Sequence, residues 1–179
     1  MNITVYLGAN SIEDEKIERA VTELGEWIAF NGHTLVYGGS KTGLMGILAE
    51  SVMKNGGKAI GVEPQFFIDA GYQYDGLSEL IVTNDMAQRK AKMIELGEAF
   101  IAFPGGTGTL EEISEVMSKV SLRHINAPCI LYNIDGFYDS LKTLLQHMTD
   151  KGLSTKKRQE GIYFCNSLEE IIKTLKKCE

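Results

Sequence analysis

Residues 34–46 read TLVYGGSKTGLMG, and this stretch decides how the chain folds. Its first part, Thr34–Tyr37, is a short run of β-branched, aliphatic and aromatic residues and predicts a buried strand. The segment Gly43–Asn55 then carries the apolar spacing of a helix. The glycines between the two segments allow the positive φ angles and close approaches of a tight turn. A buried strand, a glycine-rich turn and a helix in succession form the repeating unit of a parallel α/β sheet.

The same alternation extends in both directions along the chain. Besides Thr34–Tyr37, strands are expected at Ile3–Gly8, Lys58–Val62, Leu80–Thr83, Ala99–Phe103, Pro128–Tyr132 and Ile162–Phe164. Helices are expected at Glu13–Asn31, Gly43–Asn55, Asp85–Gly97, Thr109–Arg123, Phe137–Lys151 and Leu168–Lys177. Because right-handed crossovers cover both faces of such a sheet, we expect one Rossmann-like, doubly wound α/β domain over residues 1–179.

One segment, Pro64–Gly76, departs from this alternation. It is rich in aromatic residues and turn formers, and it has neither the period of a helix nor that of a strand. We therefore expect an irregular excursion that acts as a lid or as part of an interface.

Composition narrows the range of partners. The 179 residues carry a net charge of −6, whereas proteins that bind nucleic acids usually present a basic surface. No run reaches the ~18 apolar residues of a membrane span, and the N-terminal residues MNITVYLGANS lack the features of a signal peptide. The cysteines Cys129, Cys165 and Cys178 have no metal-ligand spacing, which favours a reducing compartment. We expect a cytoplasmic protein that binds no nucleic acid, no membrane and no metal.

Two glycine-rich turns connect an expected strand to an expected helix: residues 37–46, and residues 104–112, which read PGGTGTLEE. The N–H groups at a helix N-terminus attract phosphate, and ligands bind at the carboxyl ends of parallel strands. The alternative is that both turns are tight turns with helix caps and hold no ligand. The first turn lacks the Lys-Ser/Thr pair of a P-loop, and residues 8–11 lack Gly-x-Gly-x-x-Gly, which disfavours ATP hydrolysis and NAD binding.

Glu112 admits two interpretations. Thr109-x-x-Glu112 matches a capping box, in which both side chains bond to helix N–H groups, and Ser167-x-x-Glu170 shows the same pattern away from any glycine turn. A carboxylate in the first helical turn beside a phosphate pocket would instead suit cleavage of a glycosidic bond, because it stabilises an oxocarbenium-like state or orients a water. Glu111 points to another face of the helix and is expected in solvent.

Arg89 is the second candidate for a functional side chain. It follows Met86 by three residues and precedes Met93 by four, so the three side chains share one helix face. A guanidinium among methionines suits a site that contacts a purine and a phosphorylated sugar. The alternative is an arginine that extends along the helix edge with its charge in water. The pattern alone places the adjacent Lys90 in solvent.

Together these motifs resemble the LONELY GUY (LOG) family, the cytokinin riboside 5′-monophosphate phosphoribohydrolases, whose members are often labelled lysine decarboxylases. PGGTGTLEE at 104–112 corresponds to the family's PGGxGTxxE, and MAQRK at 86–90 to MxxRK. YGGSKTGLMG at 37–46 corresponds to a YGGGxxGLMG turn. The resemblance covers most of the chain in consistent order.

The resemblance implies hydrolysis of a purine riboside 5′-monophosphate, an N6-modified or plain AMP, to the free base and ribose 5-phosphate, with no metal or redox cofactor. It implies that Arg89 and Glu112 are catalytic. The phosphate would be held by Gly39, Gly105, Gly106, Thr107, Gly108 and Thr109. Met86 and Lys90 would help to form the base pocket. The resemblance also implies a homodimer with its active sites at the subunit interface.

The chain departs from the family's pattern at three places. Its first turn reads Leu7-Gly8-Ala9-Asn10-Ser11 instead of Cys-Gly-Ser-Ser/Arg, Ser40 replaces a glycine, and Glu63 replaces the apolar residue of Gly-Val-Ile-Pro. These differences leave the choice between N6-modified AMP, plain AMP and another nucleotide open. The main alternative function is a non-catalytic carrier of a nucleotide or of molybdenum cofactor, which shares this layout. A pyridoxal-phosphate-dependent lysine decarboxylase is disfavoured because it needs a Schiff-base lysine in a much larger scaffold.

Overall fold

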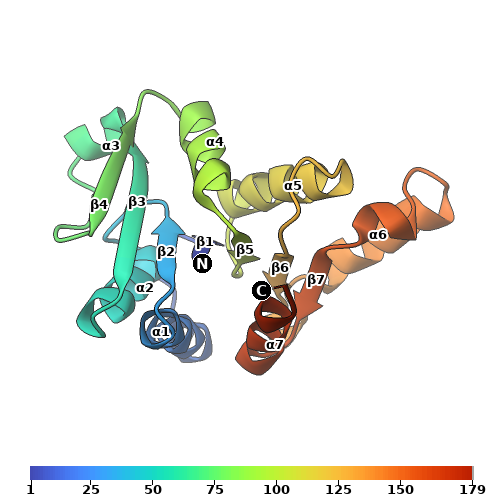
Figure 1. Cartoon of the computed structure of the whole chain (residues 1–179), viewed down its shortest axis with the longest axis horizontal. Helices are drawn as coiled ribbons and strands as arrows, with labels where there is room; N and C mark the ends of the chain where they lie inside the picture. Colours follow the sequence, from blue (N-terminus) through green and yellow to red (C-terminus); the bar gives the residue numbers. More distant parts are fainter. Residues whose placement is uncertain (179) are drawn as a thin grey trace.

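The computed structural model describes residues 1–178, which form a seven-stranded sheet with helices on both faces (Figure 1). The sheet order is β4-β3-β2-β1-β5-β6-β7, and every neighbouring pair is parallel. The strands are β1 (Asn2–Tyr6), β2 (Thr34–Tyr37), β3 (Lys58–Pro64), β4 (Glu79–Thr83), β5 (Ala99–Ala102), β6 (Cys129–Tyr132) and β7 (Ile162–Cys165). This arrangement confirms the expected Rossmann-like α/β fold.

Helices connect most successive strands. They are α1 (Glu15–Phe30), α2 (Gly43–Lys54), α3 (Gln65–Asp69), α4 (Met86–Leu96), α5 (Thr107–Ser121), α6 (Asp139–Asp150) and α7 (Leu168–Cys178). Two 3-10 turns are also present, η1 (Ile134–Gly136) and η2 (Lys156–Gln159). The start of α1 is set by Asp14, whose carboxylate accepts the N–H groups of Lys16 and Ile17.

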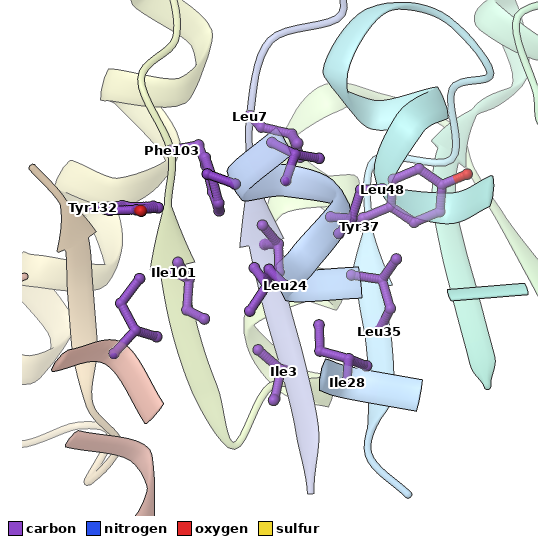
Figure 2. Close-up of a cluster of buried hydrophobic side chains, with 14 of the residues drawn as sticks. Ile3, Leu7, Leu24, Ile28, Leu35, Tyr37, Leu48, Ile101, Phe103 and Tyr132 are labelled. Carbon is purple, nitrogen blue, oxygen red and sulfur yellow. The ribbon is translucent and has the colours of Figure 1, made fainter. Parts of the chain in front are cut away.

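The core consists of two apolar layers, one on each face of the sheet. Ile3 and Val5 of β1 belong to the layer that contacts α1, α2 and α7, whereas Tyr6 points to the layer beneath α4, α5 and α6. Figure 2 shows the first layer, in which Leu24 and Ile28 of α1 lie over the central strands. Because both faces are covered, the central strands are predominantly apolar, which makes their sequence signal strong.

The chain changes direction across the sheet at β1. The strands β1 to β4 are added toward one edge, and β5 to β7 continue on the other side of β1. The connections after β1 and β5 therefore diverge, and a crevice opens between them at the carboxyl ends of the strands. Both glycine-rich turns lie at this edge, beside the loop that follows β1.

Two expectations about local structure are wrong. The segment Pro64–Gly76 is not irregular throughout, because β3 continues to Pro64 and α3 follows directly. The fixed φ of Pro64, here −69°, is compatible with the start of a helix. Helix α5 begins at Thr107 instead of Thr109, since Gly106 adopts the extended conformation of the N-cap residue.

The described thiols lie inside the protein. Cys129 and Cys165 are buried and free, and the side chain of Cys178 lies outside the part of the chain that the structure describes. Burial raises the pKa of the Cys129 thiol, so this group stays protonated and packs as a small apolar side chain. Among residues 1–178, no helix has the length and apolar character needed to traverse a bilayer.

The fit of the loop after β1 against α2 depends on Gly43. Its φ is +57°, and a Cβ at this position would collide with the carbonyl oxygens of Ala9 and Asn10. Gly56 also has a positive φ, +73°, but open space around its Cα. We expect Gly43→Ala to lower the free energy of unfolding by about 2 kcal/mol more than Gly56→Ala, because only the first change forces backbone apart. Urea unfolding measures both losses, and equal losses would contradict a tight fit.

Candidate active site

A cavity of about 650 Å³ opens at the carboxyl edge of the sheet. It is bounded by the loops after β1 and β2, the end of β3 and the segment after it, and the first turns of α4 and α5. Its volume lies within the range of small-molecule sites, and it occupies the position where doubly wound sheets bind ligands.

Arg89 forms the charged centre of this cavity. It lies at the end of the first turn of α4 and is only 5% exposed, so the alternative of an arginine with its charge in water is wrong. Its Nε donates a hydrogen bond to the carbonyl oxygen of Val62 at 3.0 Å, and its Nη1 donates to Oε1 of Glu112 at 2.6 Å. A Cβ on Gly38 would overlap Nη2 of Arg89, so glycine is required where the turn after β2 passes the guanidinium. These contacts fix the guanidinium from three sides.

Glu112 pairs with Arg89 and does not cap its helix. Because α5 begins at Thr107, Glu112 lies in the second helical turn, and the capping-box interpretation of Thr109-x-x-Glu112 is wrong. The matching pattern near α7 does cap, since Ser167 Oγ accepts the N–H of Glu170 at 3.3 Å. Burial raises the pKa of the Glu112 carboxyl, and the Arg89 guanidinium opposes that rise.

The N-terminus of α5 offers an anion site at the cavity wall. Its N-cap residue, Gly106, has no side chain, so no capping side chain satisfies the first N–H groups of the helix. The segment Thr107–Thr109 supplies these groups and lines the cavity. The helix is 15 residues long, and its dipole adds partial positive charge at this end. The arrangement suits a phosphate group.

Glu63 is a second buried carboxyl of the cavity, and the sequence analysis assigned it no role. It lies at the end of β3, is 1% exposed, and its Oε2 has no hydrogen-bond partner. A Cβ on Gly39 would lie 3.1 Å from this oxygen, so the turn after β2 passes closely over it. Burial raises the pKa of Glu63 to about 7, against the opposing effect of Arg89.

Helix α3 and the segment after it form an aromatic wall, which consists of Phe67 and Tyr72. It is fastened to the turn after β2, because the N–H of Lys41 donates to the carbonyl oxygen of Tyr72 at 2.8 Å. Ser40 and Gln73 pair as an antiparallel bridge in the same place. The segment expected to be irregular therefore contributes a fixed side of the cavity, with apolar rings facing the ligand space.

The structure brings together most of the residues predicted for the site. Arg89, Glu112 and Met86 line the cavity, together with Gly106, Thr107, Gly108 and Thr109 of the turn before and within α5. Three predicted residues are not among those that line the cavity: Gly39, Gly105 and Lys90. A Cβ on Gly105 would collide with the side chain of Thr109, so this glycine shapes the turn. Lys90 Nζ contacts Glu111 Oε1 at 2.5 Å, which ties α4 to α5.

Sequence reasoning missed several lining residues. They include Glu63, Met45, the aromatic wall and the loop residues Gly8, Ala9, Asn10 and Ser11. The only signal for Glu63 and for this loop was their departure from the family's motifs. Within residues 1–178, no three His, Cys, Asp or Glu side chains are grouped as a metal site requires. Arg89, which uses two of its five N–H donors, and the start of α5 are the cationic features of the cavity.

The chain is similar to known proteins over nearly its whole length. A family model described as "Possible lysine decarboxylase" matches residues 45–175. The cytokinin riboside 5′-monophosphate phosphoribohydrolase of Rhodococcoides fascians is 38% identical over 178 residues, which span 98% of this chain and 89% of that protein. The cytokinin riboside 5′-monophosphate phosphoribohydrolase LOG7 of Arabidopsis thaliana is 33% identical over 177 residues, 99% of this chain and 82% of that protein.

Solved structures share the fold at lower identity. The molybdenum cofactor carrier protein from Chlamydomonas reinhardtii matches with a TM-score of 0.75 and 21% identity, covering 99% of this chain and 96% of that chain. The molybdenum cofactor binding protein from Rippkaea orientalis matches with a TM-score of 0.71 and 24% identity, covering 98% and 95%. At these identities the likeness concerns the fold alone.

The raised pKa of Glu63 predicts a pH-dependent stability. Between about pH 4.5 and pH 7 the folded protein keeps a proton on Glu63 that the unfolded chain has released. The unfolded state then binds fewer protons, so this group makes the free energy of unfolding fall as pH rises through the window. Glu63→Gln removes the effect, and its stability relative to wild type should increase toward pH 7 by at most about 3 kcal/mol. Urea unfolding at several pH values checks this, and parallel curves for the two proteins would contradict it.

Proposed function

The chain belongs to the LONELY GUY (LOG) family, and from that membership and the cavity geometry we propose that it hydrolyses the N-glycosidic bond of a purine riboside 5′-monophosphate. The products are the free purine and ribose 5-phosphate. The observation that carries the proposal is the buried Arg89–Glu112 pair beside the uncapped start of α5. The Arg89–Glu112 pair suits the sugar at its scissile bond, and the start of α5 suits the phosphate.

The phosphate binds at the start of α5. The backbone N–H groups of Thr107, Gly108 and Thr109 donate to its oxygens, and the helix dipole favours its charge. Gly105 and Gly39 act from behind the wall, because they let the turns after β5 and β2 approach the ligand space. Binding energy at the phosphate then positions C1′ for the reaction.

Glu112 acts at C1′ of the ribose. As the C1′–N9 bond breaks, its electron pair leaves with the purine, and positive charge develops on the sugar ring. The Glu112 carboxylate stabilises that charge and accepts a proton from the attacking water, whose oxygen bonds to C1′. The purine takes up a proton from solvent, and Glu112 returns its own proton to solvent afterwards. Atoms and charge therefore balance over one turnover.

Arg89 keeps Glu112 in the required state. Its hydrogen bond at 2.6 Å favours the ionised carboxylate, which burial alone would disfavour. It also fixes the direction of the carboxylate, because its Nε is anchored on the Val62 carbonyl oxygen. Met86 supplies an apolar edge for the base, and Lys90 supports the site by holding Glu111.

The proposal predicts that the wild-type protein releases a free purine from AMP or from an N6-substituted AMP, as read by chromatography across a panel of nucleoside monophosphates. Glu112→Gln should lower turnover by about 10²–10⁴-fold, because the amide neither accepts the proton nor stabilises the charge as well. Nucleotide binding, measured by calorimetry, should largely survive, since the phosphate site is untouched. Glu115→Gln is the matched control, because Glu115 is on the same helix but outside the cavity wall.

Two results would overturn the proposal. The first is unchanged turnover in the Glu112→Gln protein. The second is tight binding of nucleotides by the wild type without release of any base, which is the behaviour of a carrier.

We also propose that a second copy of the chain completes the open side of the cavity, as a homodimer. Met86 on α4 lines the cavity and is 38% exposed, and Leu110 on α5, the neighbour of the lining residues Thr109 and Glu111, is 45% exposed. Leu110→Asp should shift the protein toward monomer in sedimentation and reduce kcat/KM, because it places a charge in an apolar contact. Leu153→Asp, at an exposed position after α6, is the control. A wild-type monomer with full activity would refute this arrangement.

A further inference from the structure

Three buried polar atoms without hydrogen-bond partners gather near the turn after β2. They are Tyr37 Oη, Glu63 Oε2 and Gln73 Oε1, and within the described residues they are the buried side-chain atoms that lack a partner. Gln73 is paired with Ser40 across an antiparallel bridge. Burial raises the pKa of Tyr37, and the nearby Glu63 carboxylate adds to that rise. Of these residues, only Glu63 lines the cavity.

An unpaired buried carboxyl is unfavourable by itself. A buried polar group that loses its hydrogen bonds costs free energy, and native proteins satisfy nearly all such groups. Glu63 is 1% exposed, so bulk solvent does not compensate this cost. A polar ligand group in the cavity would do so, and the carboxyl would then contribute to affinity and to the choice of ligand.

The position of Glu63 indicates which part of the ligand reaches it. In the sheet, β3 is three strand spacings from β5, or roughly 14 Å from the turn that leads into α5. Arg89 lies between these ends, because it bonds both Glu112 on α5 and the carbonyl oxygen of Val62, the neighbour of Glu63. A nucleotide with its phosphate at α5 and its C1′ at Glu112 therefore extends its base toward Glu63.

The surroundings of Glu63 also suit a purine ring. Met45, Phe67 and Tyr72 line the same cavity and offer apolar or aromatic surface to a flat ring. Against this surface, Glu63 is a buried polar group that can recognise an edge of the base. In its ionised form it accepts hydrogen bonds, and in its protonated form it accepts one bond and donates another to an adjacent ring nitrogen.

On the basis of the proposed function, we propose that Glu63 is a specificity-determining residue that accepts a hydrogen bond from an unsubstituted amino group on the purine. The site then prefers a 5′-monophosphate with a free amino group, such as AMP, over one whose amino group carries an apolar substituent. An apolar substituent replaces one of the two N–H donors of the amino group. On the side that faces Glu63 it leaves the carboxyl buried and unpaired, which disfavours that substrate by about tenfold or more.

The test compares kcat/KM for AMP and for N6-dimethylallyl-AMP in wild type, Glu63→Gln and Glu63→Met. Wild type should prefer AMP. Glu63→Met keeps a similar shape without an acceptor, and it should shift the ratio toward the alkylated substrate by about tenfold or more. Glu63→Gln retains an acceptor oxygen and should keep part of the preference. Glu95→Gln, an exposed carboxylate on α4 outside the cavity, is the control and should leave the ratio unchanged.

A binding measurement covers variants that lose turnover. The dissociation constants of adenine and N6-dimethylallyladenine, measured by calorimetry in the presence of ribose 5-phosphate, should change in the same direction as the kinetic ratio. Circular dichroism of each variant confirms that the fold is retained. In this measurement too, the conservative variant Glu63→Gln should keep part of the preference.

The outcomes separate this inference from the proposed function. Suppose that wild type hydrolyses AMP but that Glu63→Met changes neither the ratio of kcat/KM for the two substrates nor the ratio of dissociation constants for the two bases. The inference is then overturned and the hydrolase proposal stands. If the variants instead change discrimination between AMP and 2′-deoxy-AMP, Glu63 contacts the sugar and the inference is again wrong. If wild type hydrolyses no nucleotide, the hydrolase proposal fails, and equal binding of the two bases would overturn the inference as well.

Discussion

The ion pair between Arg89 and Glu112 is the constraint on which the site depends. Two opposite charges, each less than a tenth exposed, are stable inside a protein only when they pair closely and their remaining donors find acceptors. Here the guanidinium is held by Glu112 on one side and by the Val62 carbonyl oxygen on the other. The same pair requires glycine at position 38, because any side chain on Gly38 would displace the guanidinium. The two helices and the end of β3 are thereby locked into one arrangement.

Much of the fold could be predicted from the sequence because its signals are local. A strand such as Thr34–Tyr37 is buried on both faces, so four consecutive apolar or β-branched residues are enough to mark it. The start of α5 was harder to predict, because its N-cap residue, Gly106, has no side chain that would mark a helix start in the sequence. Helix α3 was also missed, since it is only five residues long, which is too short to show a helical period, and none of its residues is buried.

The site could be predicted only in part, because its residues are far apart in the sequence and meet only in the folded chain. Arg89 and Glu112 were suggested by their helix positions and by family motifs, but their contact depends on how α4 and α5 lie across the sheet. The capping-box pattern at Thr109 and the one at Ser167 look alike in sequence, and only the first residue of each helix distinguishes them. Glu63 carries no local signal at all, because its burial results from the turn after β2 closing over it. Contact between the turn after β2 and the end of β3 depends on the order of the strands in the sheet, which cannot be deduced from a single sequence.

The distribution of charge in the cavity fixes how a nucleotide can enter it. Glu63 and Glu112 are both acidic, and the Arg89 guanidinium is already paired with Glu112, so the region around Arg89 does not attract a phosphate as an unpaired arginine would. The start of α5 has unsatisfied N–H groups and no acidic residue in its first turn. A phosphorylated ligand therefore has one favourable orientation, with its anionic end at α5 and its uncharged base toward β3. The opposite orientation would bring the phosphate against two buried carboxyls, where it would lose its hydration and be repelled by either carboxyl in its ionised form.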